Sequence, residues 1–195
     1  MNASRALRRF VTVGLSTAAI SSVLTLFSAA GAASLGLWAA MVALVLVIAV
    51  GILFDVLGVA ATAASEEPFH AMAADRVFGA RQAIWIVRNA DRVANFANDM
   101  VGDAAGILSG ALGAAVVGRL AGGRPGVGEL WATTAMVALV SGLAVGGKAA
   151  FKGLAMERAR AIVLAMGRTV ATLERLAGRP VVTGGRRPTG ARRAR

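Results

Sequence analysis

The sequence contains no cysteine and a single histidine, His70, among its 195 residues. Without cysteine, disulfides, thiol nucleophiles and thiolate metal sites are excluded, and one histidine excludes a multi-histidine metal centre. Charge is also absent over a long stretch, because no charged residue stands between Phe10 and Phe54. Few nucleophile and base pairs can be formed from what remains, and we expect no enzymatic activity.

Apolar residues are abundant instead, at 57% of the sequence, and the mean hydropathy is +0.69. Such values are typical of a membrane protein. As one helix, Phe10 to Phe54 would extend roughly 68 Å against an apolar bilayer thickness of about 30 Å, so the chain must fold back near 31–36. Further candidate spans cover 100–118 and 130–147. We predict an all-α integral membrane protein, a bundle of three to four spans with cytoplasmic interfacial helices.

Residues 1–36 allow two interpretations. The basic start MNASRALRRF, the apolar run after it and the small residues SAAGAAS resemble a cleaved signal peptide. The apolar run is longer than the roughly 7 to 15 residues of a signal core, which favours a retained first span. With either interpretation, the second span, which begins at Leu37, starts outside the cell.

The 21 Lys and Arg residues predict the orientation of the spans. Three precede the first span, four lie between the second and third, two lie between the third and fourth, and twelve follow from Lys148 onward. By the positive-inside rule, both termini and the 64–98 connection are cytoplasmic in a multi-pass protein of the plasma membrane. The net charge of +11 therefore indicates topology and attraction to anionic lipids, and we expect no binding of nucleic acid.

The segments on the cytoplasmic side carry two more predictions. The 64–98 connection is too apolar for a simple loop and predicts short interfacial helices, the first begun by Glu66, Glu67 and Pro68 and capped by the hydroxyl of Ser65. Residues 161–178 predict an amphipathic helix that lies on the leaflet or pairs with a second copy. Its apolar side includes Ile162, Met166 and Leu173. The tail at 179–195, rich in Gly, Pro and Arg, is predicted to be disordered.

Carboxylates and amides enter the apolar segments at helical spacing. Acidic groups at membrane depth cost several kcal/mol unless they face a partner or a water-filled cavity, so they are functional candidates. Their oxygens, with the Ser65 hydroxyl, suit a hard cation such as magnesium. The structural alternative is that Asp99 caps a helix and that Asp55 meets a backbone donor or Lys148. The candidate ligands are Ser65, Glu66, Asn98, Asp99 and Asp103, with Asp55 and Lys148 as further site residues.

Glycines recur at every fourth position in the last two spans, at 102, 106 and 110 and again at 142 and 146. Rows of small residues let two helices approach closely in lipid. They predict a homodimer, and close packing within one subunit is the alternative.

Three motifs in order resemble the transmembrane domain of the CNNM/CorB/CorC family of magnesium-transport-related proteins, over about residues 37–160. In AASEEPFHAM, Ser65 and Glu66 match the family's Ser-Glu positions. In ANDMVGD, Asn98 matches its asparagine. In GKAAFK, Gly147 and Lys152 match the motif Gly-Glu-x-x-Pro-Lys. The resemblance implies three spans, cytoplasmic interfacial helices, and a homodimer around an acidic cavity that holds magnesium.

The chain departs from the family in two ways. Lys148 stands at the glutamate of the last motif and Phe151 at its proline. In addition, the 48 residues after Gly147 are too few for the paired regulatory nucleotide-binding (CBS) domains that usually follow. Two functions follow from the sequence. One is divalent-cation binding or transport, with Asp99 and Asp103 supplying the missing carboxylate. The other is a non-transporting membrane scaffold or regulatory subunit.

Overall fold

The computed structural model describes residues 36–120 and 127–178, together with the single positions 11, 15, 22, 31 and 34. Every regular element in these ranges is a helix, and three helices are long and apolar enough to cross a membrane. The all-helical prediction is therefore confirmed. Apart from those single positions and Gly36, the segment predicted as a first span or signal peptide lies outside the described residues, as does the tail at 179–195.

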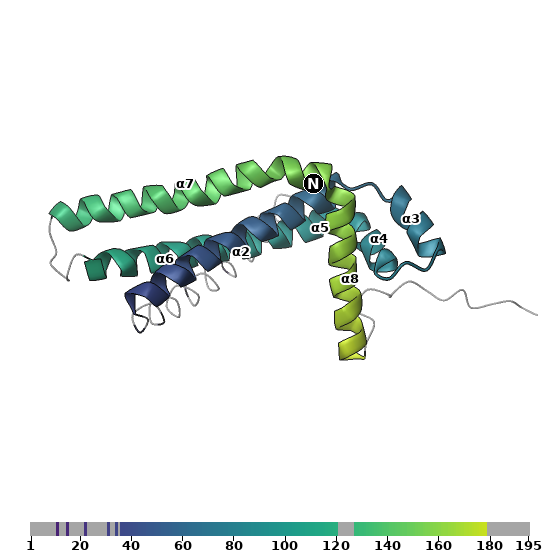
Figure 1. Cartoon of the computed structure of the whole chain (residues 1–195), viewed down its shortest axis with the longest axis horizontal. Coiled ribbons are helices and arrows are strands. Elements are labelled where there is room, and N and C mark those ends of the chain that lie inside the picture. Colours follow the sequence, from purple (N-terminus) through teal and green to yellow (C-terminus); the bar gives the residue numbers. More distant parts are fainter. Residues whose placement is uncertain are drawn as a thin grey trace, which may run out of the picture.

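Three long helices run side by side (Figure 1). They are α2 (Leu37–Ala63), a continuous helix made of α5, η1 and α6 (Ala90–Leu120), and α7 (Val127–Glu157). The 27 residues of α2 give a length of about 40 Å, more than the apolar thickness of a bilayer. Leu44 and Ile48 of α2 pack against Leu112 of α6, and Met136 and Val140 of α7 join this core. Helix α2 thus holds the bundle together, because it contacts both other helices extensively.

The second long helix is interrupted by a wide turn. It begins as α5 (Ala90–Asn95), passes through the π-helical segment η1 (Phe96–Gly102) and continues as α6 (Asp103–Leu120). The helix starts ten residues before the predicted span. It contacts α2 along η1, so Asn98 and Asp99, which directly precede the predicted span, lie in the π-helical stretch that packs against α2. Such π-helical turns are frequent at functional sites.

Three shorter helices gather at one end of the bundle (Figure 1). These are α3 (Glu67–Ala74), α4 (Ala80–Arg88) and α8 (Ala159–Ala177). Phe69 of α3, Ile86 of α4 and Val163 of α8 are buried in one core that also includes Ala60 and Ala61 of α2. Full burial of a Phe or Val side chain contributes about 1.5 to 3 kcal/mol, so this core fixes the short helices to the end of α2.

The start of α3 differs from the prediction at Ser65. The N-cap residue is Glu66, no side chain caps the helix, and Ser65 is exposed in the connection from α2. Glu67 and Pro68 occupy the first turn, as predicted. The Glu66 carboxylate turns instead to His70 and Arg88, so the helix start is held by side-chain contacts rather than by a hydroxyl cap.

The side of α8 that is buried within the chain covers only part of the predicted apolar side. Ile162 and Met166 are partly buried, whereas Leu173 is 62% exposed, where it is available to the leaflet or to a second copy. The fully buried positions recur at intervals of four, at Ala159, Val163, Gly167 and Ala171. Most of these residues are small because α8 crosses α4 at close range, which large side chains would prevent.

Candidate functional site

An ion pair joins two of the long helices. Nζ of Lys148 on α7 lies 3.7 Å from Oδ1 of Asp55 on α2. The two side chains are 35% and 20% exposed, so the pair is largely enclosed by the bundle. The same ammonium also lies beside η1, because a β-carbon on Gly102 would be 3.8 Å from Nζ. The pairing of Asp55 with Lys148, the structural alternative raised by the sequence, is thus what the structure contains.

Next to this pair, Asn98 of η1 approaches the backbone of α2. A β-carbon on Gly58 would lie 2.6 Å from Oδ1 of Asn98, so any larger residue at position 58 would force the Asn98 amide to shift. Oδ1 is buried and has no hydrogen-bond partner among the described residues. A buried carbonyl oxygen without a donor costs free energy unless a water or a cation meets it. We call Asp55, Gly58, Asn98, Gly102 and Lys148 the polar centre.

The remaining predicted ligands lie elsewhere on the surface. Asp99 and Asp103 are exposed, and their side chains have no hydrogen bond or ion pair with any residue that the structure describes. Ser65 is also exposed. Within the described ranges, no group of three or more His, Asp or Glu side chains is placed to hold a metal. The cation site built from Ser65, Glu66, Asn98, Asp99 and Asp103 stays a prediction.

Comparison of the chain with protein-family models, curated proteins and solved structures gives no match. The likeness to the CNNM/CorB/CorC transmembrane domain therefore rests on its three short motifs.

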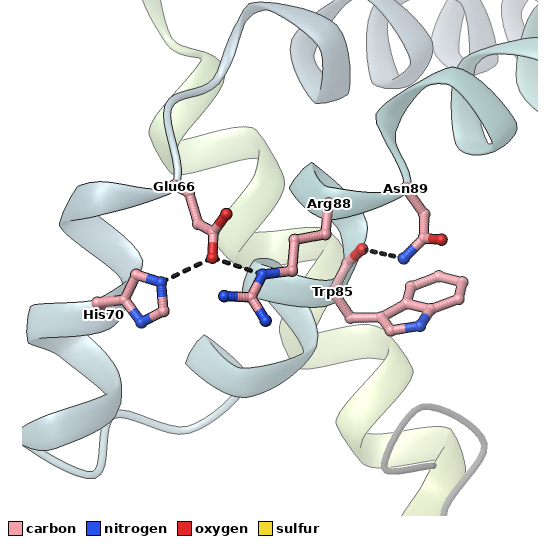
Figure 2. A network of polar contacts seen from close by, with 5 residues as sticks. All are labelled: Glu66, His70, Trp85, Arg88 and Asn89. Atoms are coloured by element: carbon pink, nitrogen blue, oxygen red, sulfur yellow. Dashed lines mark hydrogen bonds and ion pairs between the residues drawn. The ribbon is translucent and has the colours of Figure 1, made fainter. Parts of the chain in front are cut away.

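Glu66 forms a separate cluster outside the bundle (Figure 2). Its Oε1 accepts hydrogen bonds from Nε2 of His70 at 2.7 Å and from Nε of Arg88 at 2.6 Å. The hydrogen bond from His70, followed by the hydrogen bond and charge of Arg88, lowers the pKa of the Glu66 carboxyl below its usual value of 4.5, against an opposing effect of burial. The cluster ties the start of α3 to the end of α4.

The polar centre can do limited chemistry as it stands. It offers one carboxylate and one amide oxygen, and an ammonium already faces the carboxylate. Magnesium prefers about six oxygens in octahedral geometry, so it would fit only with several waters or backbone carbonyls and with Lys148 turned away. The sequence indicated Asp55, Asn98 and Lys148, but it gave Gly102 only as part of a glycine row and did not indicate Gly58. The missing side chains of these two glycines make room for the other three residues.

Proposed function

We propose that this chain is a multi-pass protein of the plasma membrane, with α3, α4 and α8 on the cytoplasmic side. Two observations support the orientation. Three helices have the length and composition to span a bilayer, and the end of the bundle that carries the short helices is the basic end. The arginines there are Arg76, Arg81, Arg88, Arg92, Arg158, Arg160, Arg168 and Arg175. By the positive-inside rule this end faces the cytoplasm.

The orientation can be tested with single cysteines, since the chain has none of its own. A cysteine at Thr189 should resist an impermeant thiol reagent in intact cells and react after permeabilisation. A cysteine at Gly123, between the second and third long helices, should react in intact cells. Labelling at 189 without permeabilisation would overturn the proposed orientation.

Within the membrane, we infer a non-transporting scaffold or regulatory subunit whose polar centre is closed by its own lysine. The observation that carries this inference is the contact between Lys148 and Asp55. An ammonium at the carboxylate supplies the positive charge that a divalent cation would bring, and it removes the need for one. The resemblance agrees with this reading, because Lys148 stands where the family has a glutamate.

The second candidate is divalent-cation binding or transport, and the buried Oδ1 of Asn98 favours it. This oxygen has no donor among the described residues, and the π-helical turn that carries it is a wide backbone conformation typical of functional sites. Lys148 is 35% exposed and has a long flexible stem. If the ammonium moves to the surface, Asp55 and Asn98 become available to magnesium.

One set of measurements separates the two candidates. Magnesium binding, by thermal-shift titration in detergent, and flux, in proteoliposomes, are compared for the wild type, Lys148→Glu and Lys152→Glu. The Lys152 variant is the control, because it makes the same charge change on an exposed residue one turn further along α7. A closed centre predicts no response from the wild type or the control and a gain of binding in Lys148→Glu. Saturable wild-type flux that Asn98→Ala abolishes would establish transport instead.

The predicted homodimer is also part of the proposal. No described atom lies within 4 Å of a β-carbon added to Gly106, Gly110, Gly142 or Gly146. Both rows are therefore open at these four positions within the described residues, whereas Gly102, the first of its row, lies beside Lys148 in the polar centre. Open rows of small residues support a second copy packing against the bundle in lipid.

A further inference from the structure

An open cavity of about 480 Å³ lies between the α3–α4 turn and the last turns of α8, away from the polar centre. It belongs to the cluster of short helices and not to the three-helix bundle. Its size falls in the usual range for small-molecule sites, roughly 300 to 1,000 Å³. The residues with charged or polar side chains that line it are Arg76, Arg81, Gln82, Glu174 and Arg175.

Positive charge dominates this cavity. Three arginines, Arg76, Arg81 and Arg175, line it against one acidic residue, Glu174. The carboxylate accepts a hydrogen bond from Nε2 of Gln82 at 2.7 Å, which joins α4 to α8. Neither Arg76 nor Arg81 has a side-chain hydrogen bond or ion pair within the described residues, so both present unused donors to a ligand.

The third guanidinium is held in place by an aromatic ring. Cζ of Arg175 lies 4.2 Å from the centroid of the Phe78 ring, and both residues line the cavity. A guanidinium stacked on a ring keeps its donors in the plane, where they can meet a planar or tetrahedral anion. This contact orients Arg175 before any ligand arrives.

The backbone that carries Arg76 is in an unusual conformation. Arg76 has φ of 57°, the one positive φ of a non-glycine residue in the described ranges. It follows the C-cap of α3, where the amide of Val77 donates to Met72 O at 2.8 Å and that of Arg76 donates to Ala73 O at 3.2 Å. This is a Schellman ending, and glycine is the usual residue at its left-handed position. The chain carries an arginine there at a conformational cost, and its side chain lines the cavity.

The start of α4 adds a further positive element. Gly79, the N-cap of α4, lines the cavity with φ of 86°, and no side chain caps the helix. The amide of Ala80 donates to Val77 O at 3.2 Å, but Arg81 and Gln82 of the same first turn line the cavity, so the positive end of the helix dipole lies at its wall. The helix start and the three arginines together form a positively charged site that suits a compact anion with several oxygens.

From this arrangement we propose that the cavity binds a phosphate group, as the phosphate monoester of an anionic lipid or as a soluble phosphate. Arg76, Arg81 and Arg175 donate to the phosphate oxygens, and the start of α4 contributes its dipole. Glu174 opposes binding and limits its strength. The site is independent of the polar centre, so the outcome for magnesium does not affect it.

The test uses the full chain in mild detergent with inorganic phosphate as the first probe, measured by calorimetry at constant ionic strength. The second probe is phosphatidylcholine dissolved in the same detergent as mixed micelles, with or without phosphatidic acid, whose headgroup is a phosphate monoester. The key variant is Arg76→Gly with Arg81→Gln. The matched control is Arg92→Gln with Arg160→Gln, which removes the same charge from exposed residues that do not line the cavity.

The expected result is saturable phosphate binding that falls about tenfold or more in the cavity variant and is unchanged in the control, since two charge-assisted contacts are lost. Glu174→Gln, which keeps a hydrogen-bonding group beside Gln82, should bind severalfold more tightly. If phosphatidic acid competes with inorganic phosphate, the lipid headgroup is the ligand, and if it does not, the ligand is soluble. Equal losses in the cavity and control variants would mean attraction by net charge alone and would overturn the proposal, as would no saturable binding of either probe.

Discussion

Gly167 of α8 packs directly on the backbone of Gly79 at the start of α4. A β-carbon at position 167 would overlap the carbonyl oxygen of Gly79 and lie 2.9 Å from the amide nitrogen of Ala83. In the other direction, a β-carbon on Gly79 would lie 2.6 Å from the amide nitrogen of Arg168. The obstacle in each case is backbone, which cannot swing aside as a flexible side chain can. The crossing of α4 and α8 therefore depends on both glycines.

Gly167→Ala should destabilise the protein by about 1 to 3 kcal/mol, because the added methyl group forces the two helices apart. Gly153→Ala on α7 is the control. No described atom lies within 4 Å of a β-carbon there, and alanine favours a helix over glycine by roughly 0.5 to 1 kcal/mol. Thermal unfolding followed by circular dichroism in detergent should show opposite shifts. Equal midpoints for Gly167→Ala and the wild type would contradict the close crossing.

The sequence predicted elements better than contacts. Apolar length alone located α2, because a helix of that composition has few alternatives. The sequence could not predict that Glu66 pairs with Arg88, 22 residues away, because that contact depends on how α3 and α4 pack. It also placed Asn98 with Asp99 and Asp103, whereas the π-helical η1 directs the Asn98 oxygen at Gly58 and leaves both aspartates exposed. Propensities do not indicate such a turn, which arises from packing against α2.

The contacts of Glu66 predict a small dependence of stability on pH. Its pKa is below 4.5 in the folded protein, so its stabilising effect is fully present above that value and is lost as pH falls through the lowered pKa. The difference in melting temperature between the wild type and Glu66→Gln should therefore be larger at about pH 5 than at about pH 3. Since Glu66 is 32% exposed and Arg88 60%, solvent screens the cluster and the difference will be modest. A difference that grows toward pH 3 would contradict this assignment.

The pair of Asp55 and Lys148 predicts an asymmetry between single and double substitutions. Lys148→Met leaves a carboxylate without its partner inside an apolar bundle and should cost about 1 to 2 kcal/mol, a lower value than for a fully buried pair because Lys148 is partly exposed. Adding Asp55→Asn should recover most of that loss, since no charge is then left unpaired. Melting temperatures in detergent test this. If the losses of stability caused by Lys148→Met and by Asp55→Asn simply add in the double variant, the two residues do not interact.

The left-handed conformation of Arg76 makes a prediction about stability alone. Arg76→Gly relieves a backbone strain of about 1 to 2 kcal/mol in the folded protein. Part of this gain in stability is offset, because glycine has greater conformational freedom in the unfolded chain. The net result should be a gain of roughly 0.5 to 1 kcal/mol in the free energy of unfolding. Arg81→Gln, at a residue with ordinary φ, should leave stability unchanged. A loss of stability in Arg76→Gly would show that the Arg76 side chain contributes to the fold itself.

The open glycine rows make the proposed dimer testable. Gly106→Leu should weaken self-association, because a large side chain in the row holds two helices apart in lipid. Gly153→Leu is the matched control, since Gly153 is also open but lies outside both rows. Size-exclusion chromatography with light scattering in mild detergent should give a dimer for the wild type and the control and a larger monomer fraction for Gly106→Leu. If the wild type and Gly106→Leu both measure as monomers, the dimer is removed from the proposal. The glycine rows would then contact lipid or another segment of the same chain.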